Sequence, residues 1–225
     1  MRNINLKYSL YLLVGISVLV FFALANLKNI EPLDFISGLK VIPKVVSIDV
    51  IIVTAFSSYM WRWKIFHSWL VPFPNLNGTW KGEIQTTWVD PLTNERPAPI
   101  PTILTIKQSF FKISCVMRTA EMTSRSMIAD FVLNKDNQVK KLSYTYDSNP
   151  IATVKERSPQ HLGTLIFDII EKPKRKIIGE YWTGRKTTGH IEMTFWKKEK
   201  LEHYPTELGT HPVSELRGDN KKKDE

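Results

Sequence analysis

The chain has 225 residues, of which 31 are basic and 22 acidic, so its formal net charge is +9. Its one cysteine, Cys115, excludes an intramolecular disulfide and a zinc site built on several thiolates, and its apolar neighbours predict a buried thiol. The positive surplus suits an anionic small ligand or an anionic lipid surface, and it does not require a DNA or RNA duplex as partner.

Two apolar runs near the N-terminus are the first predicted elements. Residues 8–25 carry no charge, and residues 45–60 carry one, Asp49. A helix needs about 17–25 residues to cross the hydrocarbon core of a bilayer. We therefore predict two transmembrane helices, at about 8–25 and 43–63, in an N-terminal region that spans residues 1–74 with its linker. A cleaved secretory signal is the alternative for the first run.

The charges around the two runs predict their orientation. Basic residues flank the outer ends of the hairpin, and the connecting loop mixes basic with acidic residues. By the positive-inside rule, both termini and the domain that follows are cytoplasmic. Asp49 has two interpretations: it lies near a helix end and reaches the headgroups, or it packs against partner helices in an assembly.

From residue 75 to residue 202 the hydrophobic pattern has a period of two, as β-strands have. Trp80, Ile84 and Trp88 alternate with polar neighbours, and Asn77–Trp80 matches the opening of lipocalin-type barrels. We predict eight strands, at about 79–88, 102–107, 112–119, 125–133, 139–146, 163–170, 176–183 and 190–197. Eight antiparallel strands close naturally into a lipocalin-like β-barrel whose interior is filled or holds one small ligand.

Two long loops and a polar tail complete the predicted domain organisation. Residues 89–101 and 147–162 are long enough to act as lids or binding edges on a rigid barrel. Residues 203–225 are polar, and we predict a mostly disordered tail.

The candidate binding residues gather in a few strand ends. Residues 179–189 combine aromatic, hydroxyl and arginine side chains at a hairpin end, where Arg185 could pair with phosphate or a base edge. A plain basic β-turn is the alternative. Tyr144 and Tyr146 share one strand face and could both enter the barrel, and Arg118 ends another strand. No catalytic signature, paired-carboxylate spacing or clustered histidines occur, so we predict a protein that is not an enzyme and uses no metal or cofactor.

The whole arrangement resembles a known family. The apolar hairpin is followed by Asn-Gly-Thr-Trp at 77–80, Tyr-x-Tyr at 144–146, His-x-Gly at 161–163 and Tyr-Trp-Thr-x-Arg-x-Thr-x-Gly at 181–189. These features resemble the two-transmembrane, β-strand-rich effector family of bacterial CBASS antiphage systems. The resemblance covers nearly the whole chain and depends most on the architecture joined to residues 181–189.

The resemblance implies a ligand and a mechanism. The barrel would bind a cyclic dinucleotide made by an infection-triggered CD-NTase, the chain would form a homo-oligomer, and its helices would disrupt the bacterial inner membrane, giving abortive infection and cell death. In the site, Tyr181 would stack on a base, Thr183 would donate a hydrogen bond and Arg185 would meet phosphate or base. Further candidate contacts are Tyr144, Tyr146, Arg118 and His161. A multi-pass inner-membrane protein without a cofactor follows from the same family.

Two other functions stay open at this point. A membrane-tethered, lipocalin-like carrier of an apolar ligand would have a dry, aliphatic barrel interior and would ignore nucleotides. A constitutive scaffold, which uses the barrel for protein contacts alone, would form oligomers without any ligand.

Overall fold

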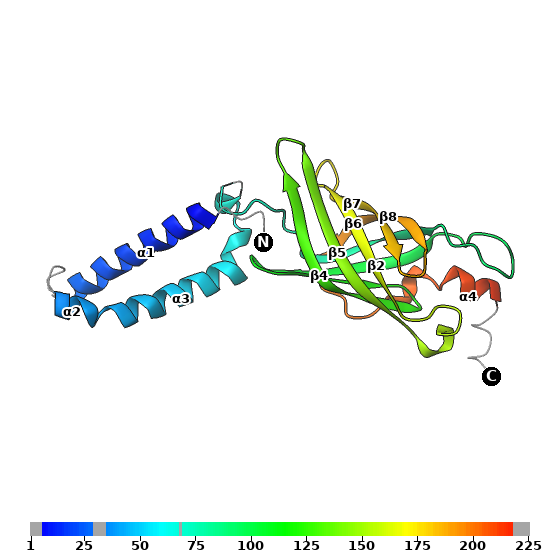
Figure 1. The fold of residues 1–225 in the computed structure, drawn as a ribbon, viewed down its shortest axis with the longest axis horizontal. Coiled ribbons are helices and arrows are strands. Elements are labelled where there is room, and N and C mark those ends of the chain that lie inside the picture. Colours follow the sequence, from blue (N-terminus) through cyan, green and yellow to red (C-terminus); the bar gives the residue numbers. More distant parts are fainter. Residues whose placement is uncertain (1–5, 29–34, 68, 218–225) are drawn as a thin grey trace. The chain divides into compact units, whose positions relative to one another are not determined.

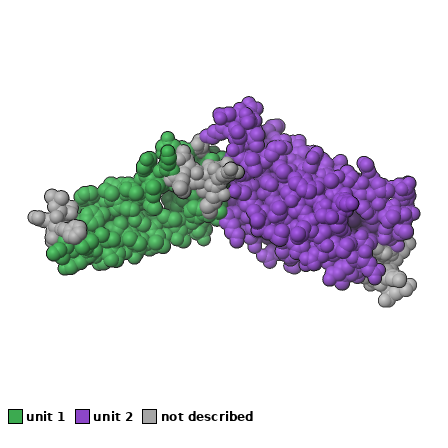
Figure 2. Space-filling model, in the orientation of Figure 1, with its two compact units in different colours: residues 1–74, 109–111 green, residues 75–108, 112–225 purple. Residues whose placement is uncertain are grey.

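The computed structural model describes residues 6–28, 35–67 and 69–217 of the chain. The chain divides into two compact units: Met1–Pro74 with Ser109–Phe111, and Asn75–Gln108 with Lys112–Glu225 (Figures 1 and 2). The first unit is helical and the second is built on strands.

The first unit is a helical hairpin. Its elements are α1 (Leu6–Leu27), α2 (Phe35–Leu39), α3 (Ile42–Ser58) and the short 3-10 turns η1 (Met60–Arg62) and η2 (Lys64–Phe66). α1 and α3 pack against each other and are joined through α2 (Figure 1). Among the described residues, only Lys7–Leu27 is both long enough and apolar enough to cross a membrane. The first predicted span is therefore present as a helix of suitable length and composition.

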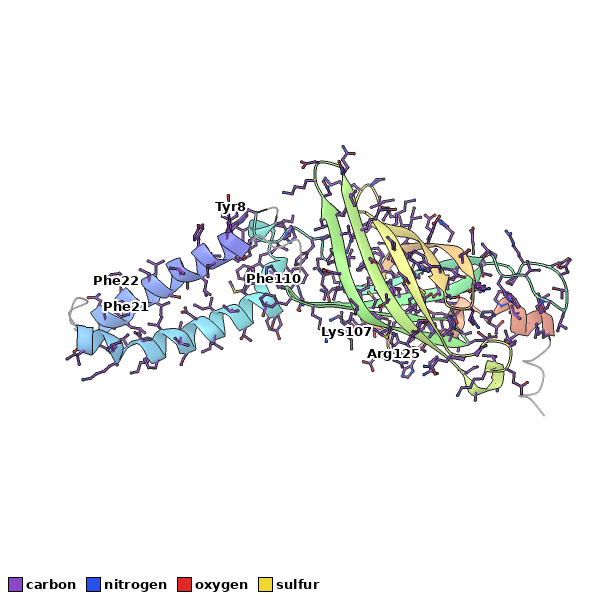
Figure 3. All side chains as sticks on the ribbon, in the orientation of Figure 1. Tyr8, Phe21, Phe22, Lys107, Phe110 and Arg125 are labelled. Carbon is purple, nitrogen blue, oxygen red and sulfur yellow. The ribbon has the colours of Figure 1, made fainter. Side chains whose placement is uncertain are left out.

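The second predicted span, at about 43–63, is not confirmed as one long helix. α3 has 17 residues and ends at Ser58, where Tyr59 leaves helical backbone geometry. The Phe110 N–H donates to the Ser57 carbonyl at 3.0 Å, which satisfies one of the free carbonyl groups at this helix end (Figure 3). Trp61 is fully buried against Phe73, with ring centroids 5.8 Å apart, so it stabilises this unit's own core.

Asp49 lies in the middle of α3 and faces α1. Its Oδ2 is 2.7 Å from the Ser17 hydroxyl of α1. This contact within one hairpin matches neither interpretation made from the sequence, a position at a helix end or a contact with a partner chain. The other carboxylate oxygen, Oδ1, is buried and has no hydrogen-bond partner within the described ranges.

The second unit is a closed barrel of eight antiparallel strands, as predicted (Figure 1). The strands are β1 (Gly78–Thr86), β2 (Ile100–Gln108), β3 (Ile113–Arg118), β4 (Met122–Asn134), β5 (Val139–Pro150), β6 (His161–Ile170), β7 (Lys176–Thr183) and β8 (Thr188–Lys197). Each strand pairs with the next along the chain, and β8 pairs with β1 to close the barrel. Because every edge is paired, the barrel leaves no open strand edge.

One end of the barrel, where β1 begins, is closed by packed side chains. The Trp80 indole is buried and donates to the Leu76 carbonyl at 2.9 Å. The Arg175 guanidinium lies over the rings of Trp80 and Phe195, 5.2 Å and 4.3 Å from their centroids, and donates to the Asn75 carbonyl at 2.6 Å. This end is therefore filled, and space for a ligand must lie toward the other end.

The segment after β8 differs from the disordered tail expected at 203–225. The Leu201 carbonyl accepts a hydrogen bond from Thr105 at 2.8 Å, and the Leu201 N–H donates to Thr79 at 3.1 Å. The chain continues through η4 (Thr206–Leu208) to α4 (Pro212–Arg217), where Val213 is only 2% exposed. Residues 203–217 are thus ordered against the barrel, and residues 218–225 lie outside the described residues.

Candidate functional site

A cavity of about 290 Å³ lies inside the barrel at the end opposite Trp80. In an up-and-down barrel, the connections that follow odd-numbered strands share one end. The β1–β2, β3–β4, β5–β6 and β7–β8 connections all contribute residues to this cavity. The cavity therefore lies at the mouth that these connections surround.

The structure brings six of the seven predicted ligand residues to this cavity. They come from β5, the start of β6, β7 and the turn after β7: Tyr144, Tyr146, His161, Tyr181, Thr183 and Arg185. These residues span more than forty positions of sequence, and pairing of β5, β6 and β7 places them side by side.

Arg118 is the exception, because it lies on the outer face of β3. Its neighbour Met117 lines the cavity, and successive side chains of a strand point to opposite faces. The Arg118 guanidinium lies 3.3 Å from the Leu201 carbonyl and 3.4 Å from the Thr105 hydroxyl. It therefore holds the returning C-terminal segment against the barrel and is removed from the candidate site.

Tyr144 and Tyr146 form an aromatic wall of the cavity. Their side chains are buried, and their ring centroids are 5.9 Å apart. Burial raises the pKa of both phenols, so they are neutral at physiological pH. The Tyr144 hydroxyl has no hydrogen-bond partner in the part of the chain that the structure describes. Burial also raises the pKa of Tyr181, and an interaction with the Thr86 side chain partly offsets this shift.

Two glycines make room for two of these rings beside neighbouring strands. A Cβ atom at Gly163 would lie 2.4 Å from the Cζ and hydroxyl oxygen of Tyr146. A Cβ atom at Gly189 would lie 2.5 Å from Cε1 of Tyr181. Both glycines belong to the sequence patterns singled out above, at 161–163 and 181–189. Their physical role is to make room for the two tyrosine rings.

Arg185 sits on a hydrogen-bonded turn at the cavity mouth. The Thr183 N–H donates to the Thr187 carbonyl at 3.0 Å, and the two threonine hydroxyls are 2.7 Å apart. Lys186 takes the left-handed backbone conformation, with φ of 62°. The Arg185 guanidinium donates to the Ser158 hydroxyl at 3.0 Å, and its buried Nε has no partner within the described ranges. The segment is therefore both a β-turn and a wall of the cavity.

His161 lies at the start of β6 beside Arg185. Its Nδ1 is 3.0 Å from the Pro159 carbonyl. Burial lowers the pKa of His161, and the nearby Arg185 charge lowers it further. The His161 ring is therefore neutral near pH 7. The positive charge on this side of the cavity comes from Arg185, in the turn between β7 and β8.

The sequence analysis missed a polar cluster on another side of the cavity. Arg157 in the β5–β6 loop donates to the Glu121 carboxylate at 2.6 Å and to the Ser214 hydroxyl at 2.7 Å. Nδ1 of His211 lies 3.6 Å from the same carboxylate. The loop at 147–162 was predicted as a binding edge, but the partners of Arg157 lie far away in sequence and no motif joins them.

Among the described residues, no group of three or more histidine, cysteine, aspartate or glutamate side chains is placed to hold a metal ion. Burial raises the pKa of the Cys115 thiol, which points to a core residue. The cavity offers a ligand aliphatic and aromatic surface, hydroxyl groups and two arginines, Arg157 and Arg185.

The comparisons with known proteins agree with this geometry. A family model described as "Cap15, cyclic dinucleotide receptor domain" matches residues 71–195. The chain is also similar to CD-NTase-associated protein 15 of Staphylococcus schleiferi, with 26% identity over 158 residues, which cover 70% of this chain and 80% of the relative. The family model matches more than half of the residues of this chain. The chain therefore belongs to the family of Cap15 cyclic dinucleotide receptor domains.

Proposed function

We propose that this protein is a CBASS effector whose barrel binds a cyclic dinucleotide made by a CD-NTase. Binding leads to a homo-oligomer, the helical hairpin disrupts the bacterial inner membrane, and the infected cell dies. The observation that carries this proposal is the cavity at the barrel mouth, in which three tyrosines and Arg185 converge in a chain of the receptor family.

The chemistry of the cavity suits a ligand with bases and phosphates. Tyr181 offers an aromatic face on which a base can stack, and such stacking contributes about 1–3 kcal/mol per base. Arg185 can pair with phosphate through two parallel hydrogen bonds. Thr183 supplies a hydroxyl beside it, and Tyr144, Tyr146 and His161 also line the cavity. The wall also includes aliphatic side chains such as Ile84, Leu165 and Ile191, so what favours a nucleotide over an apolar ligand is the pair of arginines, Arg157 and Arg185, that line the same cavity.

The hairpin supplies the membrane part of the proposal. α1 is apolar and mostly exposed, which suits a lipid surrounding. We place α1 and α3 in the membrane, with both termini and the barrel in the cytoplasm by the charge bias of the flanking residues. The contact between Ser17 and Asp49 would hold the two helices together in that apolar setting. Ligand can drive assembly only if it binds the assembled state more tightly.

The test uses the full chain in nanodiscs and a panel of labelled cyclic di- and trinucleotides. Binding is followed by fluorescence anisotropy and size by sedimentation. We expect one panel member to bind with submicromolar Kd and to shift the protein to larger species. Clean folding without binding to any member would refute the proposal, and larger species without ligand would favour a constitutive scaffold.

The variant Arg185→Ala tests the site itself. We expect its affinity to fall at least tenfold, or about 1.4 kcal/mol, while the barrel stays folded. The matched control is Arg125→Ala, which removes an exposed arginine on β4 (Figure 3). Equal affinities of Arg185→Ala and the control would remove Arg185 from the site.

A further inference from the structure

The C-terminal segment that follows η4 forms one wall of the ligand cavity. We call residues 210–217 the strap. His211 and Val213 of the strap line the cavity, and Val213 and Ser214 are buried. The strap lies across the same mouth as Arg185, so it stands between the cavity and solvent on that side.

An inner clamp holds the strap to the cavity wall. Arg157 donates to both the Glu121 carboxylate and the Ser214 hydroxyl, and Ser214 also donates to Glu121. The side chains of Arg157 and Glu121 are only 17% and 8% exposed. In this closed arrangement, the hydrogen-bond donors of Arg157, which lines the cavity, bind oxygen atoms of Glu121 and Ser214.

An outer clamp holds the end of the strap to the β1–β2 loop. The Arg217 guanidinium meets Asp90 through two hydrogen bonds, at 2.7 Å and 3.3 Å. The Arg217 hydrogen bond holds the pKa of Asp90 below its usual range, so the pair is ionised at neutral pH. Arg217 does not line the cavity, and this clamp can therefore be weakened without touching the ligand site.

The closed cavity is small for the proposed ligand. Its volume of about 290 Å³ lies just below the range of about 300–1,000 Å³ that is usual for small-ligand sites. A cyclic dinucleotide carries two bases, two riboses and two phosphates, so it is bulky for a small-molecule ligand. The strap is held by the two clamps, by His211 beside Glu121 and by the buried Val213 side chain, whereas the other walls are paired strands and the connections between them.

We propose that the strap is a lid that the ligand displaces, and that its release frees Arg157 to take a phosphate in place of the Ser214 hydroxyl. Arg157, which stays paired with Glu121, and Arg185 then each offer guanidinium N–H donors to one of the two phosphates. The inference rests on the proposed function, and it adds a gate and a second phosphate-binding residue to it. Closing of the strap competes with ligand, so the apparent Kd equals the intrinsic Kd divided by the fraction of open molecules.

Two variants weaken the lid without removing a ligand contact: Arg217→Ala breaks the outer clamp, and Ser214→Ala breaks the inner one. The full chain in nanodiscs is titrated with labelled cyclic di-AMP, cyclic di-GMP and cyclic GMP–AMP, and association rates are measured by stopped flow. For the member that binds wild type, we expect both variants to associate at least threefold faster and to bind more tightly. Arg125→Ala is the control and should match wild type.

Hydrogen exchange gives the direct readout of the strap. We expect amides of residues 211–217 to exchange faster when wild type is saturated with that ligand, while amides of β5 and β6 do not. Unchanged or slower association of both variants, or greater protection of the strap in the complex, would overturn the lid. If wild type binds no member of the panel, the proposed function fails; if wild type binds and the variants behave like it, only the lid fails.

Discussion

The buried hydroxyl of Tyr144 leads to a prediction with an unusual sign. Tyr144 is 2% exposed, and its hydroxyl finds no partner among the residues that the structure describes. A buried polar group without a hydrogen bond costs about 1–3 kcal/mol. The substitution Tyr144→Phe removes this cost and leaves a gap of ~10 Å³, which at about 24 cal/mol per Å³ costs about 0.2 kcal/mol. We therefore expect Tyr144→Phe to stabilise the barrel by about 1 kcal/mol or more.

The matched control is the same chemical change at Tyr181. Its hydroxyl interacts with the Thr86 side chain and is not a buried group without a partner, so Tyr181→Phe should not stabilise the barrel. The assay is thermal unfolding of the ligand-free full chain in detergent, followed by circular dichroism. A change of 1 kcal/mol shifts the melting temperature by about 2–4 °C for a domain of this size. A lower melting temperature for Tyr144→Phe would refute the reasoning, because it would mean that the hydroxyl is satisfied in the native state.

Three further predictions concern the cavity wall and the buried groups. Gly163→Ala should push the Tyr146 ring into the cavity, costing about 1–3 kcal/mol of stability in thermal unfolding and at least tenfold in ligand affinity. Burial lowers the pKa of His161 and of His211, so the unfolded chain binds more protons than the folded chain at acidic pH. The free energy of unfolding should therefore fall as the pH drops below about 6.5. Thermal melts at several pH values should show a smaller fall when both histidines are replaced by glutamine. The buried Cys115 thiol, whose pKa burial raises, should react with iodoacetamide only at the rate of unfolding, and rapid alkylation of the native protein would contradict its burial.

Much of the barrel could be predicted from the sequence because strand patterning is local. Alternation such as that of Trp80 and Ile84 reports which side chains face inward, and it identified all eight strands with small errors at their ends. The same alternation contained the signal that Arg118 faces outward, since Cys115 and Met117 occupy the inward positions of β3. The length of α3 was harder, because an apolar run continues past the point where Phe110 and Trp61 end the helix by tertiary packing.

The sequence by itself therefore determined the barrel and the six residues from β5 to the β7–β8 turn that share its cavity. Only the tertiary structure decided that a polar C-terminal segment returns to the barrel mouth. The contacts that hold it, Arg157 with Glu121 and Ser214 and Arg217 with Asp90, join residues up to 127 positions apart. Alternation along a strand is set by its own backbone geometry, whereas a pairing between distant side chains exists only once the barrel has closed and brought them within hydrogen-bond distance.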